Sequence, residues 1–346
     1  MIALHDIPRR IDTIIEDYLA SRSAEVCDIS PATAAAFELL GESLRGGKRI
    51  RPTFAWAGFM SAPSDEDPEA VLRAITALEF IQSCAIIHDD IIDSSDTRRG
   101  KPTVHRAVEA HHRSNAWSGN SEHYGASVAI LLGDLALSWA DDLLNSSGLS
   151  AAALARAWEP WRAMRTEVIA GQILDVSVEA SGDESIAEAE KINLYKTAAY
   201  TIARPLHLGA AIANTPADSL LRYGRDIGVA YQLRDDLLGV FGDPAVTGKP
   251  AGDDLREGKR TVLLATALQL LDAADPAAAA TLRAGVGTPN TAGLVDIIRA
   301  SGAVDVIEQR IATLTESGLA HLDDSLPPEV TSGLHSMAQK ATSRHA

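Results

Sequence analysis

Two long apolar segments of this chain are interrupted by aspartates, and this feature constrains the fold most. Residues 70–92 are largely apolar, with few polar residues before the run that starts at Asp89, and the apolar residues of 219–241 surround a second run from Gln232 to Asp236. Apolar segments of this length without strand-like alternation indicate buried helices. A carboxylate is costly to bury unless a cation compensates it. The sequence therefore predicts two helices that bring carboxylates to a cation site.

The spacing within each aspartate patch indicates the kind of cation. Asp89 and Asp93 are four residues apart and lie one turn apart on the same face of a helix. Oxygen ligands of this kind suit Mg²⁺, which takes one or two carboxylates together with water and substrate phosphates. Arg98 and Arg99 follow and supply planar donors for phosphate oxygens. The first patch is therefore interpreted as a magnesium–diphosphate site.

Helical periodicity also recurs outside the two patches, and alternating strand patterns are missing. The further segments with this periodicity are residues 11–19, 126–144, 161–178, 192–214 and 261–272. Aromatic residues make up only 5 % of the chain. We predict an all-α protein, a single domain over residues 1–346, built as a helical bundle whose two patches face each other across a large central cavity. Residues 114–124, rich in Ser, Asn and Gly, are the best candidate for a mobile loop.

Bulk properties exclude several classes of protein. A net charge of −16 argues against a nucleic-acid partner, which needs a basic footprint. Cys27 and Cys84 form no disulfide framework, which agrees with a reducing compartment. We see no signal peptide and no run of about 18 uninterrupted apolar residues. We therefore expect a cytoplasmic protein without stable membrane insertion.

Basic residues stand beside the acidic patches. The glycine-rich turn at residues 46–52 contains three cations, Lys48, Arg49 and Arg51, and alone it would be interpreted as a basic surface turn. Lys196 interrupts another apolar helix, and further lysines follow the second patch at positions 249 and 259. In so acidic a chain, cations placed in this way suggest a bound polyanion. Diphosphate with magnesium matches this combination of carboxylates and basic residues.

Other candidate groups carry less information. Asp141 and Asp142 are interpreted as a solvated helix end, whereas Asp253 and Asp254 remain open between a site and a surface loop. The histidines near residues 105–123 are not spaced like a zinc site. Nucleophile-elbow and P-loop motifs are missing from the sequence.

Taken together, these residues closely resemble the trans-polyprenyl diphosphate synthases, the head-to-tail isoprenyl transferases. The resemblance spans roughly residues 46–261. Five features agree in order and spacing: residues 46–52, residues 89–100, Gly133-Asp134, Lys196-Thr197, and residues 232–236 with Gly248-Lys249 beyond. Each feature alone is weak, but the combination is very specific.

The resemblance implies a role for each matching residue. The implied metal ligands, for three Mg²⁺ ions, are Asp89, Asp90, Asp93, Asp235 and Asp236. The implied contacts of the allylic diphosphate are Arg98, Lys196 and Lys249, with Lys259 near it. The implied contacts of isopentenyl diphosphate are Lys48, Arg51, Gln82 and Arg99. Thr197 and Gln232 would present oxygen dipoles to positive charge at the reaction centre.

The second patch departs from the family pattern at Gly239. Many members have a third aspartate at this position, so the coordination of the third metal is in question. Asp253 or Asp254 could help from the following loop through water. We do not expect the departure to abolish catalysis.

The resemblance implies elongation of an allylic diphosphate with isopentenyl diphosphate. Cys84 and Ala85 lie five and four residues before Asp89, where bulky aromatics stop the product at about fifteen carbons in the family. Since both are small, we expect geranylgeranyl diphosphate first and a longer polyprenyl diphosphate second, with Trp139 as a deeper floor. A class I terpene cyclase and a non-catalytic partner subunit remain alternatives. The resemblance and the apolar surface of residues 126–144 predict a homodimer.

Overall fold

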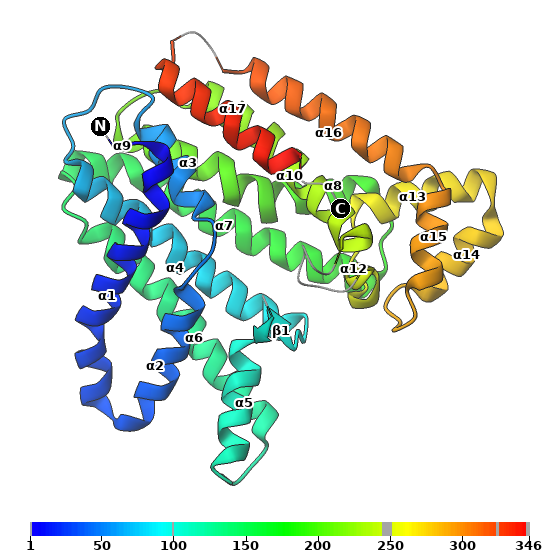
Figure 1. Cartoon of the computed structure of the whole chain (residues 1–346), viewed down its shortest axis with the longest axis horizontal. Coiled ribbons are helices and arrows are strands. Elements are labelled where there is room, and N and C mark those ends of the chain that lie inside the picture. The colour runs from blue at the N-terminus through cyan, green and yellow to red at the C-terminus, as the bar shows by residue number, and fades with distance from the viewer. Residues whose placement is uncertain (1, 99, 244–250, 323–324, 344–346) are drawn as a thin grey trace. The chain divides into compact units, whose positions relative to one another are not determined.

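The computed structural model describes residues 2–98, 100–243, 251–322 and 325–343, without the side chains of residues 31 and 32. Most of these residues are helical and the only described strands are a pair of two residues each, which confirms the all-α prediction (Figure 1). Their contacts divide the chain into two compact units. The first contains residues 1–56 and 64–156, and the second contains residues 57–63 and 157–346. Helices α3 and α7 each begin in the first unit and end in the second.

The elements of the first unit surround one long helix. They are a short 3₁₀ turn Leu4–Asp6, α1 (Ile7–Ile29), α2 (Pro31–Leu44), the start of α3 (Ile50–Phe59), α4 (Pro68–Ile92), β1 (Thr97–Arg98), β2 (Lys101–Pro102), α5 (Val104–Ser114), α6 (Ser121–Asn145) and the start of α7 (Ala151–Ser181). The side chain of Asp67 caps α4 by accepting from the N–H of Glu69, and Pro68 occupies its first turn. Strands β1 and β2 pair antiparallel and place Arg98 opposite Lys101.

Helices α4 and α6 run side by side and form the centre of this unit (Figure 1). Gly133 of α6 permits their close approach, because a Cβ at this position would lie 2.2 Å from Nε2 of His88. His88 Nε2 donates to the carbonyl of Ile130, 3.1 Å away. The Gly133-Asp134 pair, noted in the sequence as part of the resemblance, therefore fixes the helix that carries the first patch.

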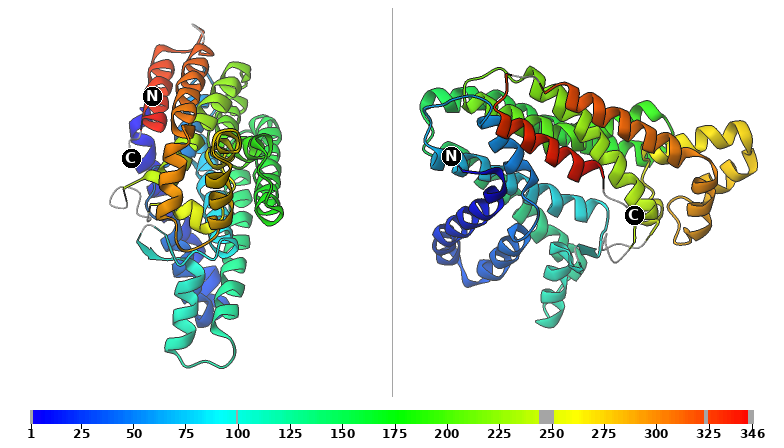
Figure 2. Two further views of the ribbon diagram at one scale, coloured as in Figure 1. Left: turned by 90° about the vertical axis from the view of Figure 1, so that its right-hand side faces the viewer. Right: turned by 45° about the horizontal axis from the view of Figure 1, so that its top comes forward.

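The second unit is arranged around α10. Its elements are the end of α3, the rest of α7, α8 (Ile186–Ile192), η2 (Asn193–Ala203), α9 (Arg204–Ile212), α10 (Asp218–Phe241), α12 (Asp253–Glu257), α13 (Val262–Ala274), α14 (Pro276–Gly285), α15 (Ala292–Ala300), α16 (Ala303–Ala320) and α17 (Pro328–Thr342). Helices α16 and α17 pack alongside α10 (Figure 2). Gly224 and Gly228 bring α10 against η2, since a Cβ at either would lie 2.5 Å from a Cα of η2.

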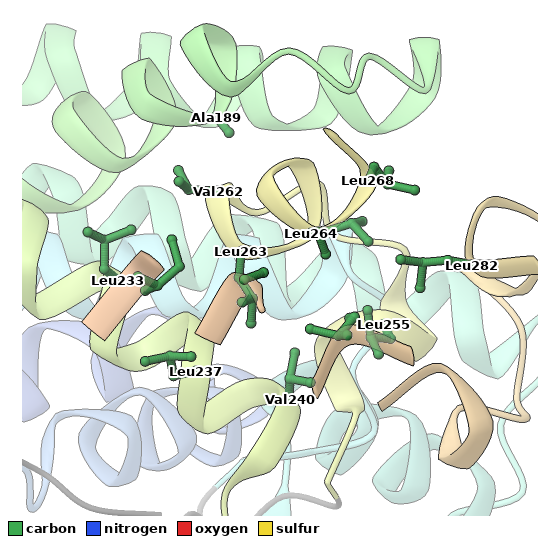
Figure 3. Close-up of a cluster of buried hydrophobic side chains, with 14 of the residues drawn as sticks. Ala189, Leu233, Leu237, Val240, Leu255, Val262, Leu263, Leu264, Leu268 and Leu282 are labelled. Carbon is green, nitrogen blue, oxygen red and sulfur yellow. The ribbon is translucent and has the colours of Figure 1, made fainter. Parts of the chain in front are cut away.

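The end of α10 that carries the second patch rests on a buried aliphatic core. Leu233, Leu237 and Val240 of α10 lie with Leu255 of α12 and with the buried face of α13 (Figure 3). Removing one large aliphatic side chain from such a core costs about 2–5 kcal/mol. This packing fixes the helix from which the carboxylates of the second patch project.

Three local features differ from the sequence-based expectations. The predicted helix at residues 192–214 is present, but η2 within it is a π-helix, a form that often marks functional sites. Residues 114 and 121–124 are helical, so the expected loop shrinks to residues 115–120. Between the second patch and the helix expected from residue 261 lies α12, an element that the sequence analysis did not predict.

Helix α4 is long and apolar enough to cross a membrane by length and composition. However, 78 % of its most apolar window is buried inside the structure. This burial is typical of the core helix of a folded domain.

Candidate active site

The first aspartate patch forms the C-terminal end of α4. Asp89 lies in its last turn, Asp90 is buried at 1 % exposure, and Asp93 is the C-cap, whose N–H donates to the carbonyl of Asp89 at 2.8 Å. Arg98 of β1 donates from Nε to Oδ1 of Asp90 at 2.7 Å, and its Nη2 lies 3.7 Å from Oδ2 of Asp89. Burial raises the pKa of Asp90, and the Arg98 guanidinium opposes this rise. The hairpin thus places a cation on the patch itself.

Arg98 therefore contacts the metal-ligand candidates directly in this structure, besides its predicted role on the allylic diphosphate. Arg99, predicted to bind isopentenyl diphosphate, lies outside the described residues. Gln82 is half-buried on α4, seven residues before Asp89. Two helical turns separate them, about 10 Å along the same face. The helix can accordingly present Gln82 and Asp89 to the same side.

The glycine-rich turn before α3 exposes two cations rather than the three expected. Lys48 is exposed and Arg51 is half-buried, but Arg49 is only 4 % exposed. Arg49 donates from Nη1 to Oε2 of Glu79 at 2.6 Å and from Nε to Oδ1 of Asp12 at 2.8 Å. The expectation that the turn presents Arg49 is wrong, because two carboxylates of neighbouring helices hold its guanidinium inside the unit.

The second patch combines an exposed and a buried carboxylate on α10. Asp235 is exposed, whereas Asp236 is 2 % exposed and accepts a hydrogen bond from Nε2 of Gln232 at 2.7 Å. Burial raises the pKa of Asp236 to about 8, and the amide of Gln232 opposes the rise while Asp254 and Asp235 add to it. Among the described residues, no donor makes a hydrogen bond of normal geometry to Oδ2 of Asp236, although the nearby amide of Asn193 also opposes the rise in pKa.

A buried carboxylate oxygen without a donor of normal geometry fits a site that receives a cation or its bound water. Within the described part of the chain, no three His, Cys, Asp or Glu side chains form a ready-made metal cage. An ion held here would therefore complete its shell with water and substrate oxygens, as Mg²⁺ commonly does. The residues of the second patch fit magnesium on these grounds.

Gly239 replaces the family's third aspartate, and the space above it is filled from α12. A Cβ at Gly239 would lie 1.9 Å from Oδ2 of Asp254. Asp253, in contrast, is buried and paired with Arg256. Nζ of Lys259 lies 3.8 Å from Oδ1 of Asp254 and 2.9 Å from Oε2 of Glu257. Of the two carboxylates considered from the sequence, Asp254 is the one that adjoins the second patch.

Lys196 and Thr197 lie on the π-helix η2, and both are half-buried. Nζ of Lys196 donates to Oδ2 of Asp175 on α7 at 2.6 Å. Gly171 lets α7 approach η2, since its Cβ would lie 2.6 Å from the backbone nitrogen of Lys196. The π geometry and this close approach together position the Lys196 side chain.

Asp175 and Glu179 were not among the predicted site residues. Glu179 has a raised pKa, caused first by burial and then by the charge of Asp175, while Lys259 and Lys196 oppose the rise. Asp175 pairs with Lys196, and Glu179 lies near enough to Lys259 and Lys196 to respond to their charges. The signal that could have found them is a pair of acids one turn apart in the mostly apolar segment 168–180.

Each unit thus holds its own set of candidate site residues. The first unit holds Lys48, Arg51, Gln82, Asp89, Asp90, Asp93 and Arg98. The second holds Lys196, Thr197, Gln232, Asp235, Asp236 and Lys259. Lys249 lies outside the described residues.

Comparison with known proteins identifies the family to which the chain belongs. The family model for polyprenyl synthetase matches residues 35–295, three quarters of the chain. The chain belongs to the polyprenyl synthetase family, whose members are magnesium-dependent prenyltransferases.

Individual relatives differ in the product that their names state. A crystal structure of geranylgeranyl pyrophosphate synthase from Corynebacterium glutamicum, complexed with isoprenyl diphosphate and magnesium, is 55 % identical with a TM-score of 0.96, covering 99 % of this chain and 100 % of that one. Geranylfarnesyl diphosphate synthase from Natronomonas pharaonis is 33 % identical over 79 % of this chain and 82 % of its own length.

A third relative matches over a shorter region. (2E,6E)-Farnesyl diphosphate synthase from Mycobacterium tuberculosis is 35 % identical over 221 residues, 62 % of this chain. The match spans 55 % of the length of that relative. Relatives with three different products show that membership in the family does not by itself determine product length.

Proposed function

We propose that this protein elongates an allylic diphosphate with isopentenyl diphosphate and releases diphosphate, with geranylgeranyl diphosphate as the product. The observation that carries the proposal is the pairing in each unit of carboxylates on an apolar helix with nearby cations. The Corynebacterium glutamicum structure, which contains isoprenyl diphosphate and magnesium, supports the same substrate class. We further propose that the whole chain acts as one catalytic domain in which the two patches face one central cavity.

Bond cleavage at the allylic carbon is the difficult step, because the departing diphosphate takes the bonding electron pair and gains charge. Bound Mg²⁺ would supply Lewis-acid stabilisation of that charge. Arg98 and Lys196 would donate hydrogen bonds to the same diphosphate oxygens, with Lys249 and Lys259 beside them. Preorganised donors of this kind lower the barrier by several kcal/mol without reorganisation during the reaction.

The cation left on the allylic fragment is attacked by the double bond of isopentenyl diphosphate, and a new carbon–carbon bond forms. Lys48, Arg51, Gln82 and Arg99 would hold the diphosphate of this second substrate. Oxygen atoms of Thr197 and Gln232 would face the positive charge. The released diphosphate is the base that takes the proton lost after attack, so the mechanism needs no protein base. Apolar helix faces exclude water that would quench the cation.

We propose three magnesium ions per active site. Asp89 and Asp93 would hold two, with Asp90 orienting their water. Asp235 would hold the third, supported by Asp236, and Asp254 would take the part of the carboxylate missing at Gly239. The position of Asp254 directly above Gly239 supports this substitution.

The proposed product length depends on small residues next to the first patch. Cys84 is buried with its Sγ 3.7 Å from Nδ1 of His88, and Ala85 is half-buried. Burial raises the pKa of Cys84 to about 11, so its thiol stays neutral. Farther along the unit, Trp139 makes edge-to-face ring contacts with Tyr18 and Phe37 at 5.9 and 5.4 Å. This aromatic group supports a deeper floor beyond the small residues.

We also propose a cytoplasmic homodimer. On α6, the neighbouring residues Ile130 and Leu131 are 46 % and 66 % exposed, and their burial against a second copy of the chain would favour a dimer. Light scattering at micromolar concentration should give twice the chain mass, and a monomer mass would count against the dimer.

The direct test is incubation of the purified chain with labelled isopentenyl diphosphate, Mg²⁺ and each allylic primer, followed by chromatography. We expect a twenty-carbon diphosphate that forms only when both substrates are present. Turnover of the allylic diphosphate alone would instead indicate a terpene cyclase. No turnover by the chain alone would indicate a non-catalytic partner subunit.

A further inference from the structure

Arg49 combines burial with an unusual backbone conformation. Its φ is +49°, in the left-handed region that residues with a side chain rarely adopt, and Gly46 and Gly47 in the same turn also have positive φ. A strained residue of this kind persists only where its surroundings hold it in place. The side chain of Arg49 is 4 % exposed, so the surroundings that hold it are internal to the first unit.

Three separate elements hold the Arg49 guanidinium. Its Nε donates to Asp12 of α1, its Nη1 donates to Glu79 of α4, and its Nη2 donates to the carbonyl of Leu44 at the end of α2 at 2.6 Å. Glu79 is itself only 8 % exposed. Nη2 also lies 2.7 Å from Oδ1 of Asp12, so acceptors from three helices surround the planar guanidinium and fix its orientation.

The anchor determines where its two neighbours in the turn point. Lys48 precedes Arg49 directly and is exposed, and Arg51 follows two residues later in the first turn of α3. Glu79 lies three residues before Gln82 on α4, so the helix that anchors Arg49 also carries Gln82. Anchoring Arg49 to Glu79 therefore sets the positions of Lys48 and Arg51 relative to Gln82.

We propose that the buried Arg49–Glu79 ion pair is a positioning device for the diphosphate of isopentenyl diphosphate. The inference rests on the proposed function, which assigns Lys48, Arg51 and Gln82 to that substrate. Arg49 does not touch the substrate. It holds the strained turn so that the cations on either side of it converge on one diphosphate, and it loses that ability if its three acceptors are not all engaged.

The test is a kinetic comparison of Arg49→Lys with the parent enzyme. Lysine keeps the charge, but its donors share one nitrogen and cannot reproduce the planar spread of the guanidinium across acceptors on three helices. We expect the KM for isopentenyl diphosphate to rise about tenfold or more, while kcat and the KM for the allylic primer change less than about twofold. An unchanged KM for isopentenyl diphosphate, or equal changes for both substrates, would overturn the proposal.

A double variant separates positioning from stability. Arg49→Met combined with Glu79→Leu replaces the buried ion pair with apolar groups, an exchange that often leaves stability intact. We expect its melting temperature to stay near that of the parent while the KM for isopentenyl diphosphate remains raised. A KM restored together with the melting temperature would mean that the ion pair serves stability alone.

Arg204→Lys is the matched control. Arg204 donates to both carboxylate oxygens of Glu167 and is mostly buried, but it lies in the second unit outside the proposed substrate contacts. We expect it to lower the melting temperature without raising the KM for isopentenyl diphosphate. A rise as large as that of Arg49→Lys would overturn the proposal, because loss of any buried ion pair would then suffice.

A parent chain without condensation activity would contradict the proposed function, and calorimetry with inorganic diphosphate would then examine the turn directly. Binding by the parent that weakens about tenfold in Arg49→Lys would support the positioning role. Equal binding by parent and variant, or binding by neither, would overturn it.

Discussion

The two aspartate patches keep buried carboxylates in place by different means. At the end of α4, Arg98 contacts Asp90 and Asp89, so a cation belongs to the patch before any ligand binds. On α10, the amide of Gln232 holds Asp236, and burial raises the pKa of that carboxyl to about 8. The first patch is balanced by charge, whereas the second is held by a neutral donor. Buried carboxylates at two candidate metal sites can therefore be held either by an arginine or by a neutral amide.

Substitutions in the first patch should cause the largest loss of activity, and they test whether this patch is indispensable. Asp89→Ala or Asp93→Ala should lower kcat by a factor on the order of 10³ or more, because leaving-group stabilisation supplies several kcal/mol. Steady-state kinetics at saturating Mg²⁺ would measure it. Asp141→Ala, at the helix end interpreted as solvated, is the control with near-parental turnover. Near-parental turnover in Asp89→Ala would show that Asp89 is not a ligand of a catalytic metal ion.

The next effect concerns the carboxylate that fills the space above Gly239. Asp254→Ala should lower kcat about 10²-fold and raise the Mg²⁺ concentration needed for half-maximal rate. Asp253→Ala is the matched control, because this neighbour is buried against Arg256 and should affect stability more than rate. If Asp253→Ala slowed turnover more than Asp254→Ala, the proposed replacement for the missing aspartate would be wrong.

The all-α fold and the main helices could be predicted because each depends on local periodicity. Contacts between segments that are distant in sequence could not be predicted in this way. Arg49 reads as one more surface cation, and its burial becomes visible only with Asp12 and Glu79 beside it. The choice of Asp254 over Asp253 likewise depends on how α12 turns toward Gly239.

A third prediction is that substitutions at Cys84 or Ala85 change the length of the product without abolishing catalysis. Cys84→Phe or Ala85→Phe should shorten the product toward fifteen carbons, because an aromatic ring fills space that the growing tail needs. Primer consumption should largely persist, since both residues lie a turn or more before Asp89. Chromatography of the products measures the shift, and Cys84→Ser is the control of similar size. Aromatic variants that make the parental product would show that the tail does not pass these residues.

The smallest expected effect is on thermal stability, and it differs between the two buried carboxyl groups, Asp236 and Asp90. The pKa of Asp236 is raised above its usual value near 3.8, so ionisation costs the folded state stability progressively as pH rises from about 4 to 8. Without metal at pH 8, Asp236→Asn should raise the melting temperature by several degrees. At pH 4 the variant and the parent should melt alike.

Asp90→Asn is the matched variant in the first patch. It should raise the melting temperature less than Asp236→Asn, because Arg98 would lose its carboxylate partner. Thermal melts in a chelator measure both variants. The reverse order would contradict the distinction between a charge-balanced patch and an amide-held patch.

In the proposed mechanism, both patches act on a single allylic diphosphate through bound metal. The most direct measurement is a crystal structure of the chain with Mn²⁺ and an unreactive thio-analogue of the allylic diphosphate, with the ions located by anomalous scattering. We predict three ions on one diphosphate, with Asp89 and Asp93 on one side and Asp235 on the other. Ions confined to one patch, or a separate diphosphate at each patch, would contradict the account.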